Sequence, residues 1–292
     1  MSVKPLITAS MGTEQKEPLP IDSRPNSVLK LQERVREGRL SWLGPLVMCF
    51  VRFPILLLCF LSAFGVLQLT GQQHAMTTAL NLTRYNLPLV ADLLCLLLLA
   101  RLVRKEGIHL RDLFCATRQH ILRDLVLGIA LFMGSYIAVA GLNVLSLFVF
   151  YGPNFFQNTQ ALQTLLGSTG INPLGIPFQI AISLLVLPIS VGFVEELVYR
   201  GYAQPRIQAL SGSKWLAILL MALGFGLQHV VFGLLSWQFA LSGFLTTFVT
   251  GIIFGGLYLL NKQRLSILIL IHWQSDLISL GLLPLLMAHF IK

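Results

Sequence analysis

Charged residues are scarce in this sequence. They make up 11% of its 292 residues, whereas hydrophobic residues make up 55%. A soluble globular domain carries about 25% charged residues. This shortage excludes a soluble enzyme, a disordered protein and a coiled coil, and it predicts a membrane protein.

Acidic residues are the scarcer of the two charged groups. The sequence has 12 Asp and Glu residues against 21 Lys and Arg, which gives a formal net charge of +9. Beyond Asp124 the only acidic residues are Glu195, Glu196 and Asp276, and all three lie in apolar sequence. An acidic side chain inside a membrane costs roughly 2.5–3.5 kcal/mol on insertion scales, so these three are candidates for function.

Cysteine pairs, targeting signals and repeats are missing as well. The four cysteines, Cys49, Cys59, Cys95 and Cys115, fall in apolar runs or in a loop expected on the cytoplasmic side. A disulfide framework is therefore not expected, and no Cys/His spacing resembles a zinc finger. No apolar stretch follows a short basic start, so the polar N-terminal region is not a cleaved signal peptide. No internal repeat is present.

Long apolar runs dominate what is present. A membrane-spanning helix needs about 20 predominantly apolar residues. The sequence therefore predicts an all-α polytopic membrane helix bundle of about seven to eight transmembrane helices. The runs lie near residues 45–69, 86–103, 124–150, 176–199, 214–234, 237–260 and 265–283. The remaining LLPLLMAHFIK segment is either an eighth, half-length helix or a bent extension of the seventh.

We divide the chain into four parts on this basis. Residues 1–40 form a polar tail that is expected to lie in the cytoplasm and to end in a short basic amphipathic helix at the membrane surface. Residues 41–175 contain the N-terminal transmembrane helices. Residues 176–283 contain the polar motifs and form the expected catalytic core, and residues 284–292 are a short C-terminal segment.

Basic residues alternate with the apolar runs. The loop after the second run is the most basic, whereas loop 151–175 carries no charge. The basic residues of the loop after the second run are Arg101, Arg104, Lys105, Arg111, Arg118 and Arg123. Under the positive-inside rule this places the N-terminus in the cytoplasm. The excess of positive charge thus reflects membrane topology, and no nucleic-acid partner is expected.

The first polar group lies in the fourth apolar run. Glu196 and Arg200 are four residues apart, so they lie on one helix face and can pair. Glu195 points about 100° away and is left without a local cation. An unpaired carboxylate in a low-dielectric cavity suits a general base. The alternative is a structural ion pair at a helix end, with both acids solvated.

Two histidines form the other polar groups. His229 ends the F-x-x-x-H pattern that begins at Phe225, and a single intramembrane histidine is more often a packed hydrogen-bonding residue than a catalyst. His272 and Asp276 are again four apart, so Asp276 can accept from the imidazole and fix its tautomer. The alternative is a pair that joins two helices. If the three runs pack together, carboxylate and imidazoles can activate water and stabilise an oxyanion.

At these residues the sequence resembles the CAAX protease and bacteriocin-processing (CPBP, or Abi) family of intramembrane proteases, which includes the prenyl-protein type II CAAX endopeptidases. The family motifs are E-E-x-x-x-R, F-x-x-x-H and H-x-x-x-N/D, in that order. Here they begin at Glu195, Phe225 and His272. The resemblance covers roughly residues 176–283, and the earlier runs match only in being apolar.

The resemblance implies a glutamate-dependent endopeptidase. Glu195 would be the general base, His229 would help to hold and deprotonate the attacking water, and His272 would face the oxyanion. Glu196 and Arg200 would form a supporting ion pair. Many relatives have an amide-donating asparagine at the position of Asp276, so for Asp276 we expect the orientation of His272 instead.

An older interpretation of the family assigns a metal to the same residues. Glu195, His229 and His272 would then supply the three protein ligands of a catalytic zinc. The sequence contains no H-E-x-x-H pattern. We favour the metal-free interpretation, with no cofactor.

The expected helix boundaries raise a difficulty for this site. If the fifth span starts at the membrane face near Lys214, then His229 lies roughly 22 Å above that face, at 1.5 Å per residue. Glu195 would lie near the cytoplasmic end of the fourth span. The fourth helix must therefore continue to Gln204, before Pro205, or the fifth must begin below the membrane, or Pro188 must bend the fourth.

Two more charged residues occur in the early runs. We expect Arg52 to extend its side chain to the membrane surface and Asp92 to face the interface near an outer end.

The resulting functional hypothesis is an intramembrane endopeptidase. It would cut a peptide or a membrane-anchored protein that enters a cytoplasm-facing cavity from the membrane or the cytoplasm. The alternative is a non-catalytic binding, scaffold or immunity protein of the same fold. We expect a multi-pass protein of a bacterial plasma membrane, which would disfavour prenylated substrates, and the sequence does not indicate an oligomeric state.

Overall fold

A computed structural model describes residues 24–114, 121–158 and 174–290 of the chain. The first 23 residues of the polar tail, Cys115, Arg118 and most of the uncharged 151–175 loop lie outside the described residues, as do the last two residues of the C-terminal segment. The three cysteines in the described part, Cys49, Cys59 and Cys95, are free.

The described residues form helices and no strand. The helices, from α1 to α14, are α1 Val28–Arg36, α2 Leu43–Phe50, α3 Arg52–Leu69, α4 Ala75–Tyr85, α5 Pro88–Lys105, η2 Leu110–Leu113, α6 Ile121–Tyr151, η4 Phe155–Gln157, α8 Ile176–Gln179, η5 Ile180–Val186, α9 Leu187–Glu196, η6 Leu197–Ala203, α10 Gln204–Ser211, α11 Lys214–His229, η7 Val230–Gly233, α12 Trp237–Leu260, α13 Leu265–Asp276, η8 Leu277–Leu282 and α14 Leu283–Phe290. The expected all-α helix bundle is confirmed.

Six helical stretches in the described part are long and apolar enough to cross a membrane, and the number rises to seven if the bent pair α4–α5 counts as one span. The two helices of that pair meet at an angle of 48° beside Pro88. The chain is therefore a multi-pass membrane protein. The C-terminal segment forms a direct extension of the seventh run, because α14 follows η8 without a break.

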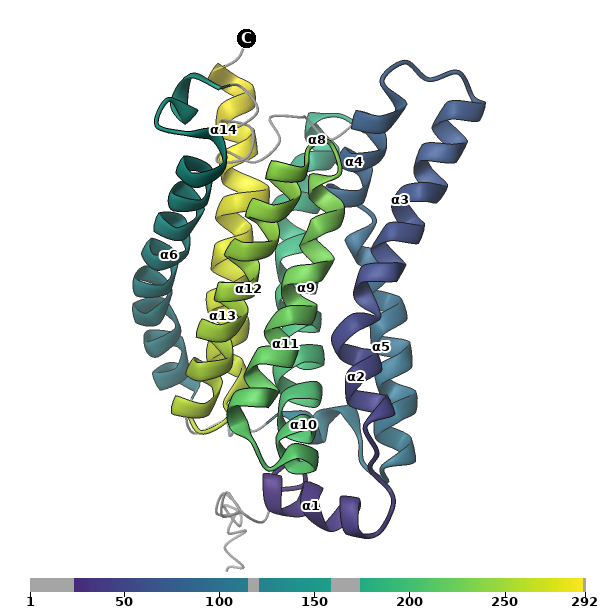
Figure 1. Cartoon of the computed structure of the whole chain (residues 1–292), viewed down its shortest axis with the longest axis vertical. Coiled ribbons are helices and arrows are strands. Elements are labelled where there is room, and N and C mark those ends of the chain that lie inside the picture. The colour runs from purple at the N-terminus through teal and green to yellow at the C-terminus, as the bar shows by residue number, and fades with distance from the viewer. Residues whose placement is uncertain (1–23, 115–120, 159–173, 291–292) are drawn as a thin grey trace, which may run out of the picture.

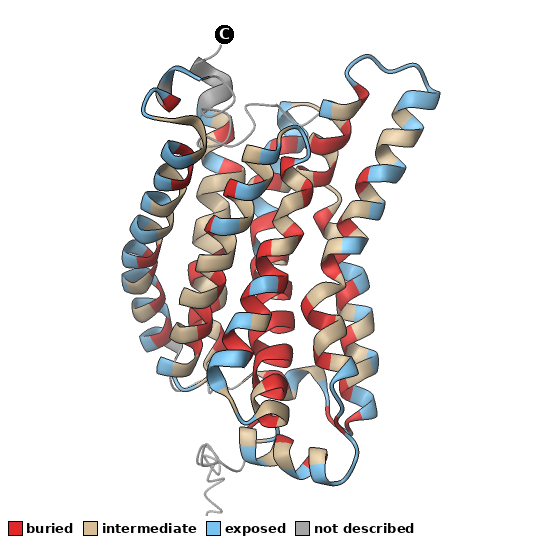
Figure 2. Ribbon diagram, viewed as in Figure 1, coloured by how far each residue is buried: buried red, intermediate tan, exposed pale blue. Residues whose placement is uncertain are grey.

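The spanning helices run side by side, and α1 lies across one end of the bundle (Figure 1). That end also carries the α10–α11 and α12–α13 turns, while the α3–α4 turn and α14 lie at the opposite end. Buried residues gather along the central helices, whereas α6 and α3 expose much of their outer faces (Figure 2). The exposed residues on these faces include Leu58, Val66, Ile137 and Val149, as expected of surfaces in contact with lipid tails.

The central helix differs from the expected fourth span. We expected it to end at residue 199, or at Gln204 before Pro205, but it continues through Pro205 to Ser211 as one stretch of 36 residues. Pro188 and Pro205 each occupy the second residue of an α-helical segment that directly follows a π-helical one. Proline lacks an N–H and clashes with the carbonyl four residues earlier. The wider π turn before each proline accommodates both effects, so the helix continues.

A buried polar network fixes α1 to the end of the bundle. The Arg206 guanidinium donates to the Glu106 carboxylate at 2.6–3.0 Å and to Asn26 Oδ1 at 2.9 Å. Asn26 Nδ2 in turn donates to the Gly201 carbonyl at 2.9 Å. Arg34 of α1 lies 3.6 Å from Glu106, and burial together with the nearby Arg206 lowers its pKa. The short basic helix expected before the first span is thus present and packed on the protein.

Candidate active site

Glu195 and His229 lie at the same level of the bundle. Glu195 precedes the end of α10 at Ser211 by sixteen residues, and His229 follows the start of α11 at Lys214 by fifteen. At 1.5 Å per residue these separations are about 24 Å and 22 Å, and the two helices run in opposite directions from one turn. With the shorter helix that we expected, Glu195 and His229 would have been at different depths in the membrane. The extension of the central helix to Ser211 brings them to the same depth.

The third motif reaches this level through a close contact between α9 and α13. A Cβ atom on Gly192 would lie 3.1 Å from the Trp273 backbone nitrogen and 3.5 Å from His272 Cβ. Gly192 lies one helical turn before Glu195. A side chain there would require the two backbones to move apart by a few tenths of an ångström, so the glycine lets His272 lie this close to the two glutamates.

The three motifs meet around one cavity of about 280 Å³. Its wall contains Glu195, His229, His272 and Asp276, whereas Glu196 and Arg200 lie behind the wall and are fully buried. The two adjacent glutamates thus have different environments. Glu195 Oε2 is buried and has no hydrogen-bond partner in the structure, so it is the carboxylate oxygen available to a substrate or a water.

Glu195 has a cation partner, contrary to the sequence prediction. Arg52 Nη2 lies 3.1 Å from Glu195 Oε1, and Arg52 Nη1 donates to Asp92 Oδ1. Ser190 Oγ donates to the other Asp92 oxygen at 2.7 Å. Arg52 and Asp92 are 1% and 2% exposed, so neither reaches the membrane surface or the interface as we expected.

Sequence reasoning missed this charge network because its members come from different helices. Arg52 belongs to α3, Asp92 to α5 and Glu195 to α9. A usable signal was present, however. Arg52 and Asp92 are opposite charges in two apolar runs, and charged groups inside a membrane usually pair with each other.

His272 is oriented by Glu196, whereas we expected Asp276 in that role. Its Nδ1 lies 2.8 Å from Glu196 Oε1, which also accepts from Arg200 Nη1 at 2.8 Å. Its Nε2 lies 3.6 Å from an oxygen of Asp276 and 3.6 Å from one of Glu195, which is too long for a hydrogen bond. The Glu196–Arg200 pair expected from the spacing is therefore present, and it holds the imidazole as well.

His229 is held by its own helix. Its Nδ1 lies 2.8 Å from the Phe225 carbonyl, so with Nδ1–H donating, Nε2 is free to face the cavity. Phe225 packs against both histidine rings, with ring centroids 5.2 Å from His229 and 5.9 Å from His272. The first residue of the F-x-x-x-H pattern thus supports two of the polar groups.

Among the described residues, no group of three or more His, Cys, Asp or Glu side chains is arranged to hold a metal ion. Glu195, His229 and His272, which we considered as zinc ligands, share the cavity wall without forming such a group.

Comparison with known proteins finds a similarity in the part of the chain that contains the three motifs. Residues 177–278 match the family model of the type II CAAX prenyl endopeptidase Rce1-like proteins. No curated protein and no solved structure matches the chain. The matched segment begins at the α8 helix and ends two residues after Asp276, so it contains all three motifs. The segment that is similar to the Rce1-like type II CAAX prenyl endopeptidases thus includes the central helix of the bundle.

Proposed function

We propose that this protein is an intramembrane endopeptidase in which Glu195 activates water to hydrolyse a peptide bond. The observation that carries the proposal is the cavity itself. It brings together a carboxylate oxygen without a hydrogen-bond partner and two imidazoles from three separate helices. These are the groups that general-base hydrolysis needs.

The reaction begins with a water held between Glu195 Oε2 and His229 Nε2. Glu195 takes a proton from this water, and the resulting hydroxide attacks the carbonyl carbon of the scissile bond. Glu195 then passes this proton to the leaving nitrogen as the C–N bond breaks, so that a carboxylic acid and an amine are released and Glu195 is a carboxylate again. Arg52 holds the other oxygen of Glu195 and leaves Oε2 pointing to the reacting water.

His272 stabilises the oxyanion of the tetrahedral intermediate. Because its Nδ1–H donates to Glu196, its Nε2 carries an N–H only when the ring is protonated. Carboxylates of Glu195, Glu196 and Asp276 lie within 4 Å of the ring and compensate the charge of the imidazolium. His272 therefore acts as a charged donor, with Glu196 and Arg200 holding its orientation.

The partners and the location belong to the same proposal. The substrate is a peptide or a membrane-anchored protein, the lipid bilayer surrounds the bundle, and the host membrane is a bacterial plasma membrane. The N-terminus lies in the cytoplasm, because the basic residues gather at the α1 end.

The proposed function is tested by replacing Glu195. Membrane peptides from cells with the wild-type protein and with Glu195→Ala are compared by mass spectrometry. Peptides that end at a new cleavage site should disappear in the variant while its abundance in the membrane is unchanged. The matched control is Glu37→Gln, which removes an exposed carboxylate outside the bundle. If the same peptides persist with Glu195→Ala and the cells keep their full function, the protein is a binding, scaffold or immunity protein instead.

The metal-free mechanism needs its own test. The purified protein is assayed in excess chelator, and its metal content is measured by mass spectrometry. We expect full activity without bound zinc. Loss of activity on chelation, with recovery on added zinc, would overturn this part of the proposal.

A further inference from the structure

The cavity is closed on the side that faces α1. Phe225 and Phe254 form its floor and are 3% and 2% exposed. The Arg200 guanidinium lies behind both rings, 4.7 Å from the Phe225 centroid and 5.3 Å from that of Phe254. His272 meets both aromatic rings, with centroids 5.9 Å and 5.7 Å away.

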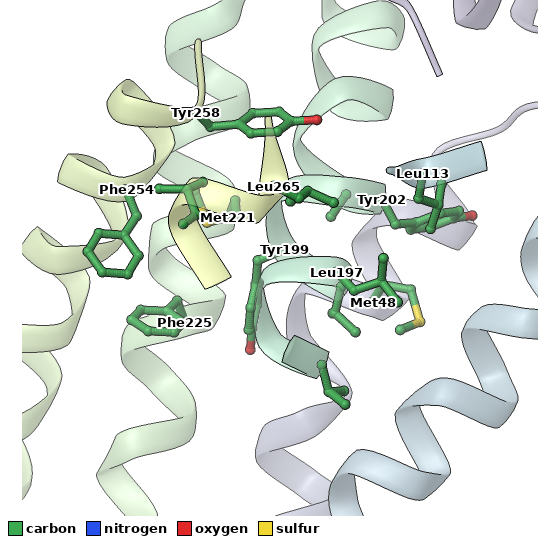
Figure 3. Close-up of a cluster of buried hydrophobic side chains, with 14 of the residues drawn as sticks. Met48, Leu113, Leu197, Tyr199, Tyr202, Met221, Phe225, Phe254, Tyr258 and Leu265 are labelled. Atoms are coloured by element: carbon green, nitrogen blue, oxygen red, sulfur yellow. The ribbon is translucent and has the colours of Figure 1, made fainter. Parts of the chain in front are cut away.

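The largest core cluster fills the space between this floor and the α1 end of the bundle. Its buried members include Tyr199, Tyr202, Met221, Tyr258 and Leu265, each at most 1% exposed. Figure 3 shows these side chains converging from several helices. Within the part of the chain that the structure describes, a packed core thus separates Glu195 from the α1 end.

The cavity extends from Glu195 in the opposite direction. Its wall includes Asn143 near the end of α6 and Phe239 near the start of α12, and both helix ends lie away from α1. Arg84, in the last turn of α4, also belongs to the wall. All three residues are partly exposed, whereas Glu195 and His272 are 3% and 6% exposed. The cavity wall is therefore partly exposed at the ends of α6 and α12 that lie away from α1.

The charge distribution relates this direction to the two sides of the membrane. Among the described basic residues, Arg84 alone belongs to a helix at the bundle end opposite α1, namely α4, whereas basic residues crowd the α1 end and its turns. Those of the α1 end include Lys30, Arg34, Arg36, Arg39, Arg101, Arg104, Lys105, Lys214, Lys262 and Arg264. By the positive-inside rule the α1 end faces the cytoplasm.

We propose that the substrate reaches Glu195 from the extracytoplasmic side of the membrane. The substrate class is then a peptide segment on that side, either of a secreted peptide or of a membrane-anchored protein. This inference differs from the cytoplasm-facing cavity that the sequence suggested. Only the nature of the substrate rests on the proposed function, since the direction of access is a property of the fold and the topology.

The cavity wall fits an extended peptide. Along α12 it presents Thr246, Thr247 and Thr250 between the aromatic residues Phe239 and Phe254. Thr246 Oγ1 is buried and has no hydrogen-bond partner in the structure, so it is available to a substrate amide. Such a wall offers apolar contacts to the side chains of a peptide and a hydrogen-bonding group to its backbone.

The direction of access is tested with single cysteines in a full-length protein whose four native cysteines are replaced by alanine. Thr247→Cys places a thiol in the cavity wall. Leu245→Cys is the matched control on the same helix, because Leu245 is 36% exposed and lies outside the cavity wall. Lys262→Cys marks the α12–α13 turn at the α1 end. Each is exposed to a membrane-impermeant methanethiosulfonate in right-side-out and in inverted vesicles.

We expect Thr247→Cys to react at least tenfold faster in right-side-out vesicles than in inverted vesicles. Lys262→Cys should react only in inverted vesicles, and Leu245→Cys should react in neither preparation. Reaction of Thr247→Cys in inverted vesicles alone, or no faster than Leu245→Cys, would overturn the proposal. So would reaction of Lys262→Cys from the outside, since the bundle would then have the opposite orientation. If Thr247→Cys does not accumulate, Ser279→Cys in the same wall takes its place.

Labelling requires no proteolysis, which separates this inference from the proposed function. Outside labelling together with undiminished cleavage by Glu195→Ala would leave the direction of access standing and remove the catalytic assignment. Labelling of Thr247→Cys from the inside, together with loss of cleavage by Glu195→Ala, would remove the direction of access and leave the catalytic assignment standing.

Discussion

Glu195 has two carboxylate oxygens with separate contacts. Oε1 faces Arg52 at 3.1 Å, and Oε2 has no hydrogen-bond partner and lies at the cavity. Arg52 also holds Asp92, so one guanidinium neutralises two buried carboxylates. These three charges are tolerated in the bundle only while they remain paired. A buried ion that loses its partner still carries the free-energy cost of having been removed from water. Arg52 is thus a positioning residue for the proposed base.

We expect Arg52→Gln to lower the turnover number by at least about tenfold, or ~1.4 kcal/mol of activation free energy. The variant should also lose roughly 3–5 kcal/mol of stability, since two buried carboxylates lose their cation. Arg52→Lys should recover part of the turnover number, with KM near the wild-type value, because it restores the charge. The measurements are a cleavage assay and thermal unfolding in detergent.

The control for Arg52 is Arg104→Gln, which removes an exposed arginine of α5. Equal effects of Arg52→Gln and Arg104→Gln on the turnover number would contradict the positioning role.

The last motif position allows a second test at the residue scale. Asp276 lies 3.6 Å from His272 Nε2, while Glu196 already holds Nδ1. We expect Asp276→Asn to retain most of the activity, because an amide can donate a hydrogen bond in the cavity. Asp276→Ala should lower cleavage by roughly tenfold. If Asp276→Asn is as inactive as Asp276→Ala, the negative charge itself is required.

At the scale of the helix, three features let polar residues from distant motifs meet. The central helix passes two prolines by means of π turns, so it extends far enough for Glu195 to reach the level of His229. Gly192 lets α13 approach α9. Gly224 lets α11 approach α2, since a Cβ there would lie 2.0 Å from the Cys49 carbonyl oxygen.

The α9–α13 contact is tested with Gly192→Leu. A leucine there has no room against the Trp273 backbone, so α13 must move and take His272 away from Glu195 and Glu196. We expect a loss of cleavage of more than about tenfold and a destabilisation of roughly 1–3 kcal/mol, as is typical of overpacking. The control is Gly256→Leu, because a Cβ at Gly256 meets nothing within 4 Å. Similar activity of the two variants would show that the contact does not position the site.

On the scale of the whole molecule, the bundle has two unlike ends. The end near α1 is closed by a packed core and by the buried network of Arg206, Glu106 and Asn26. The other half contains the cavity. A protein built in this way can admit a substrate from one direction while its closed end holds the helices together.

The closed end yields a stability prediction. Arg206→Met leaves Glu106 buried without its strongest partner and should cost roughly 3–5 kcal/mol. Lys30→Met breaks the exposed Lys30–Glu33 pair on α1 and should cost at most about 1 kcal/mol. Thermal unfolding measures both, and trypsin cleavage within α1 should accelerate only in Arg206→Met. Comparable melting temperatures for the two variants would refute a structural role for this network.

The sequence by itself determined the helix bundle, the membrane location and the identity of the motif residues. Apolar runs of spanning length leave few alternatives to helices, because the backbone of a spanning segment must satisfy its own hydrogen bonds. Charged residues in such runs are costly, so Glu195, Glu196 and Asp276 were visible as candidates without a structure. The spacing of Glu196 and Arg200 also indicated their pair, which is a contact within one helix turn.

Only the tertiary structure decided which groups from different helices meet. It gave Glu195 a cation in Arg52, assigned the orientation of His272 to Glu196 and extended the central helix past Pro205. It also placed the cavity on the side away from α1. Periodicity along one helix reports its faces, but the depth, rotation and close approach of neighbouring helices depend on packing between them. The partners of Glu195 are set by that packing, and so is the direction from which a substrate reaches it.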